Sequence, residues 1–143
     1  MLNAIYLYRA ARFLYLYRLT FLSRIIELLI FVLYNSRVPS SSSIGKGTVF
    51  SYGGIGVVIH KRAVIGKNCI IGTNVTIGGR SGHFKVPVIG NNVDLATGSK
   101  ILGPITLGDN VIVGANAVVI SSFATNSIVA GVPAKLIKSK INN

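Results

Sequence analysis

The chain has few acidic residues and little that could form a disulfide framework or a metal cluster. Only Glu27, Asp94 and Asp109 oppose fifteen lysines and arginines, which gives a net charge of +12 over 143 residues. Cys69 is the only cysteine, so a disulfide within the chain and a cysteine metal cluster are both excluded. Half of the residues are hydrophobic and only 13% are charged. This balance excludes a disordered chain and predicts one globular domain with an ample core.

The excess of positive charge raises the question of an anionic partner. Nucleic acid is the usual partner of such a chain. Here the basic residues are spread along the sequence, and it contains no recognition-helix or RNA-binding signature. We therefore expect no nucleic acid. Anionic lipid head groups or an anionic cofactor fit the charge equally well.

The first part of the chain contains no glycine or proline before Pro39. This predicts two helices within residues 1–36, meeting near Thr20–Ser23. The longest uninterrupted apolar run, Leu28–Tyr34, is far shorter than the roughly 20 residues of a membrane-spanning helix. Arginines interrupt the apolar stretch, which argues against a signal peptide. The sequence leaves open whether these basic apolar helices contact a membrane surface or pack on the solenoid or on a neighbouring subunit.

An aliphatic residue recurs at every sixth position between Val57 and Ser122, and glycine often follows it. A period of six fits neither a helix nor an alternating strand, and it is typical of a hexapeptide β-solenoid. We expect the aliphatic side chains to stack into a core and the glycines to serve the corners. The aliphatic positions are Ile59, Ile65, Ile71, Ile77, Ile89, Leu95, Ile101, Leu107, Val113 and Val119.

The repeat is broken in two places. Ile44 lies fifteen residues before Ile59, so three extra residues must form a bulge, which we place at Tyr52–Gly56. A whole hexad has lost the pattern at Gly79–Pro87, which predicts an extruded loop. The predicted domains are therefore helices in 1–36, a solenoid in 37–134 and a basic tail in 135–143. Breaks in a regular scaffold often carry functional sites.

The segments GVVIHKRAVIGKN, NVTIGG, ATGSKILGPITLGDNVIVGANAVV and AGVPAK resemble the hexapeptide-repeat acyltransferases of the serine acetyltransferase type. The likeness runs from about Ile44 to Lys135. The short form with apolar basic helices also resembles the O-acetyltransferases of surface polysaccharide synthesis. The resemblance implies a mainly β fold, a left-handed parallel β-helix, in a homotrimer whose sites lie between adjacent prisms. It implies acetyl-CoA as donor, no metal, and a cytoplasmic location that includes the inner face of the membrane.

The resemblance also implies which residues meet acetyl-CoA. Small residues would let the pantetheine arm approach the backbone, and Lys135 would meet a phosphate. The cofactor-binding positions carried over from the family are Gly78, Gly79, Thr97, Ser99, Ala115 and Lys135.

The family's catalytic residues do not carry over. Tyr52 stands in the position of the catalytic histidine, and Arg37–Pro39 align with the segment that holds its aspartate. A hydroxyl acceptor still needs a general base and an oxyanion donor. His83, in the extruded loop, and His60, at a corner, are the candidate bases, with Tyr52 as a hydrogen-bond donor. Asp94 is a candidate for orienting either histidine.

We expect an acetyl-CoA-dependent O-acetyltransferase acting on a hydroxyl of a saccharide or glycan precursor. Arg80 and Lys85 flank His83 and are candidate substrate-binding residues for an anionic acceptor. Cys69 occupies a packing slot, which favours direct attack over an acyl-cysteine. The alternatives are acetylation of serine or another small hydroxyl compound, and a membrane-associated scaffold without activity. A zinc enzyme of the carbonic anhydrase kind fits poorly, because the chain has only two histidines.

Overall fold

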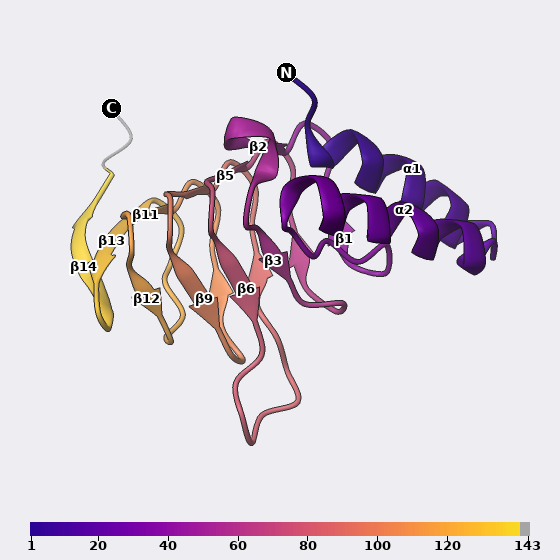
Figure 1. Ribbon diagram of the computed structural model, residues 1–143. Coiled ribbons are helices and arrows are strands. Elements are labelled where there is room, and N and C mark those ends of the chain that lie inside the picture. Colours follow the sequence, from indigo (N-terminus) through magenta and orange to yellow (C-terminus); the bar gives the residue numbers. More distant parts are fainter. Residues whose placement is uncertain (141–143) are drawn as a thin grey trace.

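The computed structural model describes residues 1–140, in which two helices precede a stack of short strands (Figure 1). Helix α1 (Ala4–Leu16) begins after Asn3, whose side chain accepts a hydrogen bond from the Ile5 amide. Helix α2 (Thr20–Tyr34) ends at Asn35, which takes a left-handed conformation. The two predicted helices are confirmed, but the break between them lies at residues 17–19, just before the predicted Thr20–Ser23.

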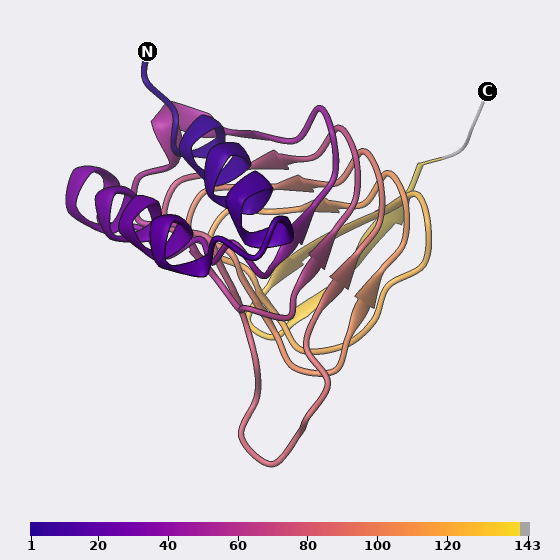
Figure 2. The ribbon, with the colours of Figure 1, turned by 90° about the vertical axis from the view of Figure 1, so that its right-hand side faces the viewer.

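The remaining residues form a parallel β-solenoid of four coils with a closing hairpin, triangular in section (Figure 2). Sheet 1 contains β1, β4, β7 and β10, sheet 2 contains β2, β5, β8, β11, β13 and β14, and sheet 3 contains β3, β6, β9 and β12. The strands are β1 (Ser43–Ile44), β2 (Val49–Phe50), β3 (Val58–Ile59), β4 (Val64–Ile65), β5 (Ile70–Ile71), β6 (Thr76–Gly78), β7 (Val88–Ile89), β8 (Asp94–Leu95), β9 (Lys100–Leu102), β10 (Thr106–Leu107), β11 (Ile112–Val113), β12 (Val118–Val119), β13 (Ser127–Gly131) and β14 (Ala134–Ser139).

The predicted aliphatic positions form the core of the solenoid. All ten are buried, and they stack in register from coil to coil, as Ile71 does on Leu95 and Leu95 on Val113. The role expected of the glycines is corrected in part. The left-handed corner residue is usually an asparagine one position before the small buried residue, at Asn68, Asn74, Asn92, Asn110 and Asn116. Asparagine tolerates this conformation better than most side chains.

The glycines that follow the aliphatic residues allow close approach between coils. A Cβ atom on Gly66 would lie 2.4 Å from the carbonyl oxygen of Gly90 in the next coil, closer than any real contact. A Cβ atom on Gly79 would meet nothing nearer than 3.8 Å. Gly66 is therefore required by backbone packing, whereas Gly79 is not.

We expect Gly66→Ala to lower the free energy of unfolding by about 1–3 kcal/mol, because the two coils must move apart. Urea unfolding of Gly66→Ala, beside the matched control Gly79→Ala, measures this cost. An equal effect of the two substitutions would show that coil spacing at this corner is not constrained by Gly66.

Both predicted breaks are found. A short 3-10 turn, Ser51–Gly54, takes up the three extra residues between β2 and β3, with Tyr52 at φ 50 inside it. Residues 79–87 leave the prism as a long loop after β6 and return to β7 (Figures 1 and 2).

Helix α1 caps the open end of the solenoid, where the first coil has no neighbouring coil on one side. Arg9 donates to the carbonyl oxygens of Ile44 and Gly45, and Arg12 donates to those of Ser40 and Ser41. The Tyr8 hydroxyl donates to the carbonyl oxygen of Ser42, at 2.7 Å. The question left open by the sequence is thus answered in part, since α1 packs on the solenoid and satisfies edge carbonyls that would otherwise need water.

The outer face of α2 remains exposed. Its exposed apolar side chains are Phe21, Leu22, Ile25, Leu28, Leu29, Phe31, Val32 and Leu33. No helix in residues 1–140 is long and apolar enough to cross a membrane.

The predicted basic tail is largely a strand. Lys135 and Lys138 lie in β14, which pairs antiparallel with β13 and covers the far edge of sheet 2. The end of the predicted tail, residues 141–143, lies outside the described residues.

Candidate functional site

A hollow of about 390 Å³ lies at one border of the outer face of sheet 3. Its lining includes His60, which follows β3, and Gly78, which ends β6 one coil further along. The His60 amide donates to the Ile77 carbonyl oxygen at 2.7 Å, which ties this corner of one coil to the next. The complete lining is Arg37, Pro39, Val58, Ile59, His60, Lys61, Ile77 and Gly78.

The His60 ring is held in one orientation. Its Nδ1 accepts a hydrogen bond from the Arg62 amide at 3.1 Å, so the neutral ring carries its proton on Nε2. The pKa of His60 is lowered, first by desolvation and then by the positive charges of Arg62 and Lys61. His60 is therefore neutral at neutral pH and suited to donate a hydrogen bond from Nε2.

The extruded loop is clamped beside this corner by Arg62. The Arg62 guanidinium stacks on the ring of Phe84, with 3.8 Å between its central carbon and the ring centroid. It also donates to the Phe84 carbonyl oxygen at 2.6 Å. His83, next to Phe84, is exposed, and its amide donates to the Arg80 carbonyl oxygen at 3.0 Å. The clamp ties Phe84, in the middle of the loop, to Arg62, two residues after His60, and leaves the His83 ring accessible.

Replacing Arg62 with glutamine should have two measurable effects. Loss of the clamp should speed tryptic cleavage after Arg80 and Lys85 several-fold. Loss of a positive neighbour should raise the midpoint of the His60 titration, which we expect below pH 6.5 in the unmodified chain, as followed by NMR. Lys67→Gln, at an exposed position outside the clamp, is the matched control. If Arg62→Gln is cleaved no faster than that control, the clamp does not hold the loop. If its His60 midpoint matches that of the control, the charge of Arg62 does not lower the pKa of His60.

The predicted cofactor residues flank sheet 3 along two borders. Gly78 and Gly79 lie at the border that carries His60, where β6 ends. Thr97 and Ala115 lie at the opposite border, in consecutive coils, each one residue before the left-handed corner position. Lys135 pairs with Ala130 at the end of sheet 2. A long thin ligand on the outer face of sheet 3 would pass between these two borders.

Ser99 differs from the other predicted cofactor residues. Its side chain is fully buried, its Oγ has no hydrogen-bond partner, and its amide donates to the Ala96 carbonyl oxygen. The hydroxyl faces the interior of the prism and cannot contact a ligand on the outer face of sheet 3, so we expect no contact between Ser99 and acetyl-CoA.

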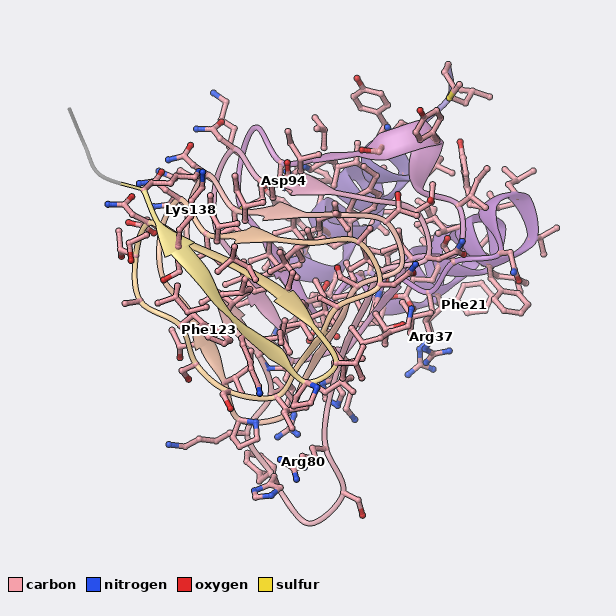
Figure 3. The ribbon with its side chains drawn as sticks, turned by 90° about the vertical axis from the view of Figure 1, so that its left-hand side faces the viewer. Phe21, Arg37, Arg80, Asp94, Phe123 and Lys138 are labelled. Carbon is pink, nitrogen blue, oxygen red and sulfur yellow. The ribbon has the colours of Figure 1, made fainter. Side chains whose placement is uncertain are left out.

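Two further candidates lie away from the hollow. Tyr52 is 74% exposed in the turn that precedes β3, whereas His60 follows β3, so the strand separates them. Asp94 lies in β8 of sheet 2, and Figure 3 shows it on the far side of the molecule from Arg80 at the base of the loop. The structure therefore does not bring Asp94 to either histidine.

The remaining predicted residues are placed by their local packing. A Cβ atom on Gly103 would lie 3.1 Å from the Cβ of Arg80, so Arg80 packs over the corner of the next coil. Lys85 is exposed on the loop. Cys69 is fully buried, as predicted, and burial raises the pKa of its thiol. Within residues 1–140, no cluster of histidine, cysteine and acidic residues is suited to a metal ion.

Sequence reasoning missed a basic cleft next to the hollow. A second hollow of about 340 Å³ shares Arg37, Pro39 and Lys61 with the first and adds Arg24 of α2. The only signal in the sequence was Arg37, which lies in the segment 37–39 that aligns with the aspartate-containing segment of the family. The approach of Arg24 and Lys61 to Arg37 follows from the packing of α2 on the first coil.

The comparisons with known proteins agree with this fold. The family described as bacterial transferase hexapeptide (six repeats) matches residues 87–121. A serine acetyltransferase of Helicobacter pylori is 37% identical over 139 residues, covering 95% of this chain and 80% of the relative. A serine acetyltransferase of Synechococcus elongatus is 35% identical, covering 94% of this chain and 56% of the relative.

Solved structures give the same class. The serine acetyltransferase of Neisseria gonorrhoeae superposes with a TM-score of 0.89 at 30% identity, over 98% of this chain and 55% of that protein. The Brucella abortus serine acetyltransferase in complex with coenzyme A superposes with a TM-score of 0.91 at 28% identity, over 98% and 56%.

Fold and repeat together define a hexapeptide-repeat protein built on a parallel β-helix. More particularly, the chain belongs to the serine acetyltransferase family. It spans 80% of the Helicobacter relative and little more than half of the cyanobacterial relative and of these solved enzymes.

Proposed function

We propose that the chain is an acetyl-CoA-dependent O-acetyltransferase whose acceptor is serine or another small hydroxyl compound. The family supports this activity, and solved relatives include a Brucella enzyme in complex with coenzyme A and a soybean enzyme complexed with serine. The observation that carries the proposal is the hollow that places His60 beside Gly78, at the border of the face available to the donor. The findings favour this small acceptor over the saccharide predicted first from the sequence.

Acetyl-CoA would lie along the outer face of sheet 3. Gly78 and Gly79 on one border, and Thr97 and Ala115 on the other, leave room for the pantetheine arm to approach backbone groups. Lys135, exposed near the end of the stack, would meet a phosphate of the donor. The thioester would then reach the hollow beside His60.

The two histidines would take different roles. Because His60 Nδ1 accepts a hydrogen bond from the Arg62 amide, its Nε2–H would donate to the thioester carbonyl oxygen and stabilise the oxyanion. His83 would accept the proton of the acceptor hydroxyl as that oxygen attacks the acetyl carbon. Collapse of the intermediate keeps the new C–O bond and breaks the C–S bond. The CoA thiolate leaves and takes the proton back from His83.

A saccharide or glycan precursor is the second candidate acceptor. Its support is the exposed basic loop with Arg80 and Lys85, together with Tyr52 at the position of the family's catalytic histidine and the lack of an aspartate in Arg37–Pro39. Turnover on L-serine compared with turnover on sugars and nucleotide sugars separates the two candidates.

The predicted homotrimer, the membrane contact through residues 1–35 and the cytoplasmic location also remain proposals. Exposed valines on the outer faces, such as Val58, Val64 and Val88, support burial between copies. The exposed apolar face of α2 supports a contact with a lipid surface or a further protein element.

The activity is tested by release of the CoA thiol from acetyl-CoA, followed with a thiol reagent. We expect release to depend on the acceptor and to produce an acetyl ester detectable by mass spectrometry. If no hydroxyl acceptor gives release while CoA still binds, the chain is a scaffold that kept the fold without the activity.

A further inference from the structure

We propose that the cleft between α2 and the first coil binds an anionic group of the acceptor, a carboxylate or a phosphate, through Arg24, Arg37 and Lys61. This inference rests on the proposed transferase function. It assigns acceptor recognition to Arg37 and Lys61, which line the hollow beside His60, and to Arg24 next to it.

The cleft is continuous with the hollow that holds His60. The two hollows share Arg37, Pro39 and Lys61, so a small molecule anchored in one can extend into the other. A third hollow of about 270 Å³ adjoins them and also includes Arg24 and Arg37. Arg37 thus borders all three spaces, between the cap helices and the reaction site.

The basic side chains of the two helices and of the adjoining coil differ in their hydrogen-bond partners. Arg9 and Arg12 already have partners at the edge of the solenoid, because their guanidinium groups donate to backbone carbonyl oxygens there. Within residues 1–140, the side chains of Arg24, Arg37 and Lys61 have no such hydrogen bonds, and all three are exposed. Figure 3 shows Arg37 pointing away from the ribbon on the side where α2 carries Phe21.

The charge of the cleft is strongly positive. Its only acidic side chain is Glu27, and one oxygen of that carboxylate already accepts hydrogen bonds from the amide and the hydroxyl of Ser40. Three cationic side chains therefore face one carboxylate that is partly occupied. Arginine binds carboxylate and phosphate through two parallel hydrogen bonds, and a concave basic surface concentrates anions.

The two hollows would bind different parts of the acceptor. The anionic end of the acceptor would be held at Arg24 and Arg37, and its hydroxyl would project past Lys61 to His60. The carboxylate of serine, a hydroxy acid and a polyol phosphate all present this chemistry, whereas a neutral polyol does not.

Inorganic phosphate is the first probe, titrated by calorimetry at low salt in the presence of saturating CoA. We expect Arg24→Gln and Arg37→Gln each to weaken phosphate binding at least tenfold. Lys46→Gln removes the same charge from an exposed position that lines none of the hollows, and it should change binding less than twofold. Absence of phosphate binding in the unmodified chain, or equal binding in all the variants, overturns the inference.

Acceptor pairs that differ only in charge then identify the group that is bound. We expect KM for L-serine to be at least tenfold below that for L-serinamide, or KM for glycerol 3-phosphate to be at least tenfold below that for glycerol. Arg37→Gln should remove this difference, whereas Lys46→Gln, which lines none of the hollows, should keep it with kcat and the KM for acetyl-CoA within twofold of the unmodified chain. Equal KM values within both pairs overturn the inference but leave the transferase proposal standing. If no acceptor is acetylated, the proposed function fails, and the phosphate titration still decides whether the cleft binds anions.

Discussion

Replacing His83 with alanine should lower kcat for acetyl transfer by about 10²–10⁴-fold, the usual contribution of a general base. His83 is the exposed imidazole of the loop that Arg62 and Phe84 hold beside His60. The KM for acetyl-CoA should stay within about twofold, because the loop tip lies outside the borders of sheet 3. Steady-state kinetics of CoA release measure both constants.

His60→Ala is the matched comparison, because it removes an oxyanion donor instead of a base. It should lower kcat by about 10²–10³-fold. If His83→Ala retains full activity, the mechanism proposed here is wrong, although the fold and the donor site are unaffected.

Leu95→Ala should cost about 2–5 kcal/mol of the free energy of unfolding. Leu95 is fully buried in the third coil, between Ile71 and Val113 in register, so truncation leaves a cavity that neighbouring coils cannot fill without losing their own pairing. Urea unfolding with an unchanged m-value measures the cost.

Val88→Ala is the control for the core substitution. Val88 lies in the same coil but is 44% exposed on the outer face, and its truncation should cost about 0.5 kcal/mol. Equal costs at the two positions would mean that the stacked aliphatic row does not dominate the stability of the solenoid.

The fold was predictable because one periodic pattern determines most of it. The buried row from Ile59 to Val119 follows from the spacing of six, and the two interruptions correctly located the turn at Ser51–Gly54 and the loop at 79–87. The packing of residues 4–34 was not predictable in the same way. The hydrogen bonds of Arg9 and Arg12 to edge carbonyls join residues about thirty positions apart, and no local pattern encodes them.

The site was predictable only as a set of chemical types. The sequence named both histidines as candidate bases because few residue types can act as a base, whereas the small residues proposed to contact the donor came from the family resemblance. The direction in which each side chain points could not be predicted from the sequence. Ser99 is small, like the other residues proposed to contact the donor, but its side chain faces the interior. Asp94 lies on sheet 2, whereas the hollow with His60 borders sheet 3. The cleft of Arg24, Arg37 and Lys61 needed the docking of α2 on the first coil before its residues could be associated.

A crystal structure of the chain with coenzyme A tests the central claim most directly. We expect the pantetheine arm along the outer face of sheet 3 and its sulfur in the hollow beside His60 and Gly78. Coenzyme A bound on sheet 1 or sheet 2, or a sulfur atom remote from that hollow, would contradict the assignment of the reaction to this corner of the solenoid.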